Sequence, residues 1–156
     1  MKLAKSVIPT ISETESTALN CGTVSIDGEI FNGTMSPDKL KTSTLTDEEQ
    51  SYIDNEVQEL CELHMKLGYD GDKLHSDTLA FMKKIGIFGL NIPKEYGGKG
   101  FSPAGNSAIV TKLSSTGHNG LAVTAMVPNS LGPGELLQQY GTDVKKANYL
   151  PKLASG

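Results

Sequence analysis

The sequence predicts an all-α domain on three observations. After residue 45, apolar residues recur at helical spacing, Ser and Thr occupy helix-start positions, and glycines or prolines separate the segments. This pattern predicts five or six helices over residues 45–156. Residues 1–44 are rich in Ser, Thr and Asn without a sustained period, so we expect an irregular N-terminal arm ahead of the helical domain.

The first helix is predicted to begin after Thr46. The run Thr46-Asp47-Glu48-Glu49 is a capping box, in which the threonine hydroxyl accepts from the backbone N–H of Glu49 and the glutamate reaches back. Apolar residues then follow at spacings of three and four, which indicates one buried stripe along the helix. Gly68 is expected to end it.

Two more helices are predicted on either side of a turn-rich crossing at residues 90–100. The second helix has Ser76 or Asp77 as its cap. The third begins at Ser102-Pro103, with serine at the N-cap and proline at the first helical position.

The fourth predicted helix, residues 119–127, is almost wholly apolar and is therefore expected to be buried on all sides. Pro128 should interrupt it. A fifth helix is expected to end at Gly141 in the left-handed conformation. A short sixth helix, capped by Thr142, should stop before Pro151.

Within the arm, residues 24–31 alternate for a few positions around Asp27-Gly28, a turn signal. We expect a small hairpin or an extended segment there.

The charge pattern excludes some classes of partner. The chain has 14 lysines, no arginine and 18 acidic residues, for a formal charge of −4. Because nucleic-acid readers usually carry clustered Lys and Arg, we expect no nucleic-acid partner. A codon bias toward lysine in an AT-rich genome is the alternative explanation for the missing arginine. No apolar run approaches the roughly 20 residues of a membrane span, so the chain is expected to be soluble.

The chain contains no convincing metal or redox motif. Cys21 and Cys61 are too few for a disulfide framework, so we expect buried or partly buried thiols in a reducing compartment. The three histidines, His64, His75 and His118, lack metal-ligand spacing. His64 lies on an apolar stripe and is interpreted as a core or boundary histidine.

Two glycine-containing segments resemble known loops without matching them. Gly97-Gly98-Lys99-Gly100 has neither the spacing nor the Ser or Thr of a phosphate-binding loop. Asp70-Gly71-Asp72 lacks the glutamate that closes a calcium loop. Spacing alone therefore predicts no catalytic, cofactor-binding or metal-binding residue.

Two longer segments carry a resemblance. Residues 88–102, FGLNIPKEYGGKGFS, and residues 127–142, VPNSLGPGELLQQYGT, followed by YLPKLASG at 149–156, resemble consecutive signatures of the acyl-CoA dehydrogenase superfamily. The sequence of the second segment is most similar to that of the large bacterial long-chain fatty acyl-CoA dehydrogenases of β-oxidation. Residues 12–33 are similar to the segment ahead of the first helix in those enzymes.

The resemblance implies the fold and the reaction. Members have an N-terminal helical domain, a middle β-domain and a C-terminal helical bundle. They use FAD to convert a fatty acyl-CoA to a trans-2-enoyl-CoA and pass electrons to an acceptor. Residues 45–156 correspond to the first domain, whereas the catalytic glutamate and most of the FAD site belong to the other two. We therefore expect the chain to lack them, to bind no FAD alone and to be inactive alone.

The resemblance also implies a role for the helix at 119–127 and the segment after it. By position in the second signature, Thr124, Val127 and Leu131 are candidates for contacts with the acyl chain. That these three residues serve only helix packing is the open alternative.

Two hypotheses follow for the protein as a whole. The first is the N-terminal part of a flavin-dependent acyl-CoA dehydrogenase, cytoplasmic, with inner-membrane association of the full-length enzyme left open. The second is a stand-alone helical binding module derived from that scaffold. The coding DNA beyond Gly156 would distinguish them, because only the first predicts a β-domain reading frame.

Overall fold

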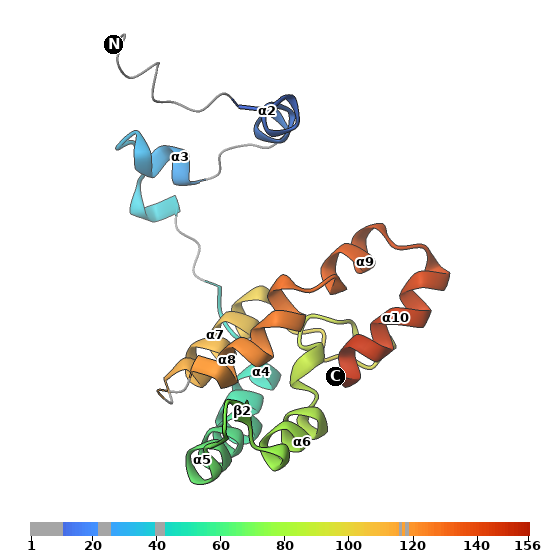
Figure 1. The fold of residues 1–156 in the computed structure, drawn as a ribbon. Coiled ribbons are helices and arrows are strands. Elements are labelled where there is room, and N and C mark those ends of the chain that lie inside the picture. The colour runs from blue at the N-terminus through green and yellow to red at the C-terminus, as the bar shows by residue number, and fades with distance from the viewer. Residues whose placement is uncertain (1–10, 22–25, 40–42, 116, 118) are drawn as a thin grey trace. The chain divides into compact units, whose positions relative to one another are not determined.

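The computed structural model divides the chain into two compact units, residues 1–42 and 43–156, which are described separately below. Helices make up most of the described residues of each unit (Figure 1). The structure describes residues 11–21, 26–39, 43–115, 117 and 119–156, and only the backbone of Lys39, Ser130 and Leu131. No helix in these ranges is long and apolar enough to span a membrane.

The N-terminal unit contains short helices where an irregular arm was expected. They are α2 (Glu13–Asn20), α3 (Ile26–Phe31) and the 3₁₀ turn η1 (Pro37–Lys39). The predicted hairpin or extended segment is wrong over 26–31; residues 24 and 25 lie outside the described residues. A helix forms over 26–31 instead: acidic residues lie in its first turn, and Gly33 follows its end with a φ of 67° that favours glycine. Cys21 is exposed rather than buried.

The second unit begins with one continuous helical run. It comprises α4 (Asp47–Tyr52), the π-helix η2 (Ile53–Val57) and α5 (Gln58–Leu67), and it ends at Gly68 with φ 66°. The start after Thr46 and the end at Gly68 confirm the prediction. The π-helix was not predicted. Its first carbonyl, that of Ile53, accepts a hydrogen bond of 3.0 Å from Lys112 Nζ, so a side chain from another helix serves the widened turn.

A short hairpin follows, formed by β1 (Tyr69–Asp70) and β2 (Lys73–Leu74), which pair antiparallel. The sequence predicted no strand here. It leads into α6 (Ser76–Ile85), whose N-cap is His75, because His75 Nδ1 accepts from the backbone N–H of Asp77 at 3.2 Å. The predicted cap at Ser76 or Asp77 is therefore wrong by one or two residues.

The next two helices, α7 (Pro103–Ser114) and α8 (Asn119–Met126), lie side by side in Figure 1. Ser102 caps α7 as predicted. After α8 the helix does not break at Pro128 but widens into the π-helix η5 (Val127–Leu131). A proline ring clashes with the carbonyl four residues earlier in an α-helix, and a π turn gives it room.

The last helices are α9 (Gly134–Tyr140) and α10 (Asp143–Ser155). Gly141 between them is extended, with φ −69° and ψ 144°, so the predicted left-handed end is wrong. The predicted stop before Pro151 is also wrong, because α10 continues through the proline. Burial of Leu150 and Ala154 against Ile92 offsets the backbone hydrogen bond that Pro151 cannot make.

The core of the second unit lies among its first four helices. Its centre comprises fully buried side chains from α5 to α8 and from the 3₁₀ turn η3 (Ile87–Gly89). A smaller cluster joins α10 to the segment after η3. Counting 47–67 and 119–131 as one helix each, the described part of residues 43–156 forms six helices, which confirms the predicted all-α class.

Candidate functional site

The apolar helical run of α8 and the first residue of η5 has a buried and an exposed side. Leu121, Ala122 and Ala125 are buried, whereas Val123 is 48% and Val127 47% exposed. The expectation of burial on all sides is therefore wrong for this unit. The sequence shows that the side chains of this helix are apolar. Which neighbouring element covers each side depends on tertiary packing.

The three candidate acyl contacts all lie on this helical run. Thr124 is half-buried, and its Oγ1 donates to the carbonyl of Gly120 at 2.7 Å. Val127 opens the π-helix and Leu131 closes it, although the side chain of Leu131 lies outside the described atoms. Thr124 lines a hollow of about 410 Å³ toward the β1–β2 hairpin, and Val127 is not among its lining residues. The structure therefore brings the three onto one helical run, not into one described hollow.

The π-helix η5 is held by Asn129, a residue that the sequence did not single out. The Asn129 side chain is buried, and its Oδ1 accepts from the backbone N–H of Leu90 at 2.8 Å. Its Nδ2 donates to the carbonyls of Ile87 and Ala125 at 2.6 and 2.8 Å. Asn129 thus joins the two segments that carry the family resemblance. An amide side chain beside Pro128 at the end of an apolar helix was the one available signal.

The glycine-rich crossing at residues 90–100 folds back on itself. Gly97 has φ 83°, and a Cβ on Gly98 would collide with the carbonyl of Ile92. The backbone N–H groups of Gly100 and Phe101 donate to the carbonyls of Ile92 and Leu90, each at 2.8 Å. The 3₁₀ turn η4 (Lys94–Tyr96) lies within this loop. Gly97 and Gly98 are therefore needed for the close reversal of the backbone.

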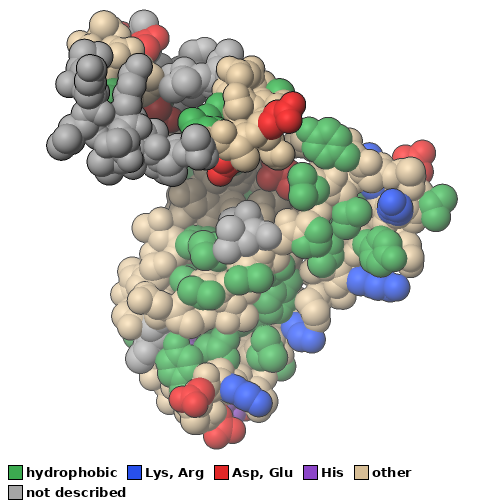
Figure 2. Space-filling model, turned by 45° about the horizontal axis from the view of Figure 1, so that its top comes forward, with side chains coloured by type: hydrophobic (Ala, Val, Ile, Leu, Met, Phe, Trp, Pro, Cys, Tyr) green, Lys and Arg blue, Asp and Glu red, His purple; other side chains and the backbone are tan. Residues whose placement is uncertain are grey.

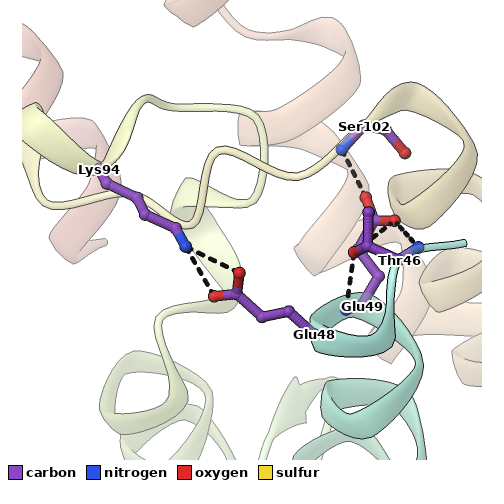
Figure 3. Close-up of polar contacts among 5 residues, drawn as sticks. All are labelled: Thr46, Glu48, Glu49, Lys94 and Ser102. Atoms are coloured by element: carbon purple, nitrogen blue, oxygen red, sulfur yellow. Dashed lines mark hydrogen bonds and ion pairs between the residues drawn. The ribbon is translucent and has the colours of Figure 1, made fainter.

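Glu49 is the most strongly perturbed acid in the described residues (Figure 3). Its carboxylate accepts from the backbone N–H of Thr46 at 2.8 Å and from that of Ser102 at 2.6 Å. Burial raises the pKa of Glu49, but the hydrogen bonds from Thr46 and Ser102 outweigh it and bring the pKa to about 2. A carboxylate this weakly basic and this fully hydrogen-bonded suits a structural role and not a general base.

Two further side chains that could be reactive, those of Cys61 and His64, are buried in the core. Cys61 is buried, and burial raises the pKa of its thiol, which disfavours the reactive thiolate. His64 is buried with its ring edge-on to Tyr69 at 5.1 Å, as expected for a core histidine. His118 lies outside the described residues. Within the described ranges, no group of three His, Cys, Asp or Glu residues is placed to hold a metal ion.

A second hollow, of about 460 Å³, lies beside Asn129, and its lining can be compared with the groups that FAD requires. Its lining combines two apolar side chains with amides and one carboxylate: Asn91, Phe101, Pro103, Asn129, Glu135, Gln138 and Gln139. The diphosphate of FAD requires cationic or backbone N–H donors, and a carboxylate opposes it. The lining of this hollow therefore does not fit the cofactor.

Apolar side chains are also exposed on the last two helices. Leu136 and Tyr140 on α9 are 64% and 79% exposed, and Val144 and Tyr149 on α10 lie open as well. Figure 2 shows several hydrophobic side chains at the surface in that view. Large exposed apolar groups of this kind are typical of surfaces that pack against further protein or ligand.

Several characterised proteins are similar to part of this chain. The very long-chain specific acyl-CoA dehydrogenase of Rattus norvegicus mitochondria is 40% identical over 86 residues, 54% of this chain and 13% of the relative. The (2S)-methylsuccinyl-CoA dehydrogenase of Cereibacter sphaeroides is 43% identical over 75 residues, 48% of this chain and 13% of the relative. The acyl-CoA dehydrogenase FadE12 of Mycobacterium tuberculosis is 32% identical over 81 residues, 52% of this chain and 20% of the relative.

These alignments span a fifth or less of each relative's length. The family model described as "Acyl-CoA dehydrogenase, N-terminal domain" matches residues 46–156, which is the helical unit from the cap of α4 to the end of α10. With its six helices and both signature segments inside this match, the chain belongs to the acyl-CoA dehydrogenase family and carries its N-terminal domain.

Proposed function

We propose that residues 45–156 form one wall of the acyl pocket in a flavin-dependent acyl-CoA dehydrogenase of fatty acid β-oxidation. The reaction is α,β-dehydrogenation of a fatty acyl-CoA to the trans-2-enoyl-CoA. The observation that carries the proposal is the outer side of α8 and η5, where Val123 and Val127 are about half exposed. An uncharged apolar helix face suits an alkyl chain.

The proposed contacts with the acyl chain are Thr124, Val127 and Leu131. The hydroxyl of Thr124 is used by the carbonyl of Gly120, so its methyl group is the part left for an apolar ligand. Val127 offers an exposed branched side chain one turn later. No Lys, Arg, Asp or Glu lies between Lys112 and Glu135, so this stretch of chain itself contributes none of these charges to the proposed wall. The hollow beside Thr124 is also lined by Asp72 and Lys73 of the hairpin.

FAD and the electron acceptor are proposed to bind other parts of the enzyme. The catalytic glutamate is proposed to lie in those parts as well. The proposal includes the β-domain and the C-terminal helical domain as partners of residues 45–156, and an inactive state of residues 1–156 alone. It also includes a cytoplasmic location, the closest kinship with the large bacterial long-chain enzymes, and residues 1–44 as a segment outside the domain.

The first test compares purified residues 1–156 with a polypeptide that continues into the sequence encoded after Gly156. We expect no flavin absorbance and no oxidation of hexadecanoyl-CoA by residues 1–156, and both properties in the longer polypeptide. Stoichiometric FAD on residues 1–156 would overturn the assignment of FAD to other domains. A monodisperse chain that binds no hydrophobic dye would favour the stand-alone binding module.

The second test concerns the acyl wall itself. Val127→Phe in the active polypeptide should shift the preference from hexadecanoyl-CoA toward octanoyl-CoA, because added bulk shortens the space for the chain. Val144→Phe is the matched control, since Val144 is also exposed but lies on α10. An equal response of the two variants would contradict the proposed wall.

A further inference from the structure

The π-helix η5 carries the second half of the proposed wall, and one buried amide side chain holds it. We infer that Asn129 is a positioning residue, which fixes η5 against the turn η3 and thereby sets the direction in which η5 presents its side chains to the acyl chain. This inference rests on the proposed function, because it takes the outer side of α8 and η5 as the wall.

The contacts of Asn129 use every polar atom of its side chain. Both amide hydrogens are donated, to the carbonyls of Ile87 and Ala125, and the amide oxygen accepts from the N–H of Leu90. The residue is 6% exposed, so these bonds are shielded from water. A carboxamide offers two donors and an acceptor in one plane, whereas aspartate has no donor and leucine has neither. The requirement at this position is therefore specific to an amide.

A second amide holds the same π-helix from the opposite direction. Asn91 Nδ2 donates to the main-chain carbonyl of Asn129 at 2.5 Å. Asn129 thus reaches out of η5 into the segment at residues 87–90, and Asn91 reaches back to the backbone of η5. Two hydrogen-bonded groups in opposite directions fix both the position and the rotation of the turn.

Rotation of this turn decides which side chains face outward. Successive residues of an α-helix point roughly 100° apart, and a π turn contains one residue more than an α turn. Relaxation of η5 to α-helical geometry would therefore turn the residues on one side of it by roughly 100° relative to those on the other. Val127 stands at the beginning of η5, next to the apolar outer side of α8. Loss of the Asn129 contacts should consequently reshape the wall and not only weaken it.

The experiment uses three variants: Asn129→Ala, the milder Asn91→Ala, and Leu60→Val as a control. Leu60 is fully buried on α5 and has no side-chain polar group to hold η5, so its variant serves to report a loss of stability. In the active polypeptide, the first readout is the ratio of kcat/KM for hexadecanoyl-CoA to that for octanoyl-CoA. The second is amide hydrogen exchange at Leu90, measured on residues 1–156.

Asn129→Ala should change the substrate ratio by roughly tenfold, and Asn91→Ala should change it in the same direction by less. Exchange at the Leu90 amide should accelerate by roughly tenfold in Asn129→Ala, because that amide loses its acceptor. Leu60→Val should leave the ratio unchanged.

An unchanged ratio in an active Asn129→Ala enzyme would overturn the inference and leave the proposed function standing. If Asn129→Ala does not fold, the ratio in Asn91→Ala decides by the same criterion. If the unaltered polypeptide oxidises neither thioester, the proposed function fails and the inference with it; the Leu90 exchange would then still show whether Asn129 holds η5.

Discussion

Two helices of this chain begin with the same four-residue device. Ser12 and Glu15 form a capping box at α2, and Thr46 and Glu49 form one at α4. In both boxes the backbone N–H of the cap donates to the carboxylate at 2.8 Å, and the backbone N–H of the glutamate donates to the hydroxyl at 3.2 Å. Their local geometry is therefore the same.

The surroundings of the two glutamates differ. Glu15 is exposed, and hydrogen bonds with Ser12 lower its pKa. Glu49 is 2% exposed and also accepts from the backbone N–H of Ser102, the N-cap of α7. Despite the opposing effect of burial, these bonds bring the pKa of Glu49 to about 2. A capping box becomes a connection between helices when a second helix start uses the same carboxylate.

The largest expected effect comes from removing each carboxylate in turn. Glu49→Ala loses the cap of α4 and leaves the N–H of Ser102 without its acceptor, so we expect the free energy of unfolding of residues 43–156 to fall by about 3 kcal/mol or more. Glu15→Ala should change it by less than about 0.5 kcal/mol. Urea unfolding followed by circular dichroism measures both. Equal losses would show that the local box alone determines stability.

Lowering the pH should also reduce the free energy of unfolding through Glu49. The pKa of Glu49 is lowered by folding from 4.5 to about 2, so its contribution is present above pH 4.5 and is lost as the pH falls from 4.5 toward 2. At about 1.4 kcal/mol for each tenfold change in ionisation, the contribution is on the order of 3 kcal/mol. Urea unfolding at several pH values should show this loss.

The control for the acid experiment is Glu49→Gln. This variant has no carboxyl group to titrate at residue 49, so its unfolding should depend less on pH over the same range. An identical pH dependence of the two proteins would assign the acid sensitivity to other groups.

A smaller effect is expected at Gly105, which faces the Glu49 carboxylate from α7. A Cβ there would lie 2.5 Å from Glu49 Oε1, so Gly105→Ala should lower stability by about 1–2 kcal/mol although alanine favours helices. Gly134→Ala on α9 is the matched control, since its nearest contact would be 3.9 Å away. Thermal unfolding of the two variants should shift in opposite directions, and a stabilised Gly105→Ala would refute the close approach.

The helices could be predicted because their signals are local. The box at Thr46, the cap at Ser102 and the end at Gly68 each depend on residues within one or two turns. The bond from Ser102 to Glu49 joins residues 53 apart in the chain, and no local pattern reports it. The two π-helices were missed for a related reason, because Lys112 and Asn129 serve them across different elements.

The candidate site was less predictable than the fold. Family position indicated Thr124, Val127 and Leu131, and their roles stay predictions. Asn129 was missed because two of its three side-chain partners, Leu90 and Ile87, lie about 40 residues earlier in the chain. An amide at the end of an apolar helix does not indicate such distant partners. The exposed side of α8 was missed because an apolar sequence does not say which neighbour covers it.

The smallest effect is expected at Glu48, directly beside Glu49 in the first turn of α4. Its carboxylate accepts from Lys94 Nζ at 2.8 Å, but both side chains are more than half exposed (Figure 3). Glu48 should therefore behave like Glu15, whose bonds also lie in water. A double-mutant cycle of Glu48→Gln and Lys94→Met should give a coupling of about 0.2–1 kcal/mol, which falls toward zero in about 1 M salt.

Salt should leave the loss in Glu49→Ala largely unchanged, because its hydrogen bonds are shielded by protein. Two adjacent carboxylates on one helical turn would then differ in both size of effect and response to salt. A coupling of about 2 kcal/mol or more between Glu48 and Lys94 at high salt would contradict the comparison. It would mean that an exposed carboxylate can hold two segments together as strongly as a buried one, and burial would no longer explain why the two capping boxes differ.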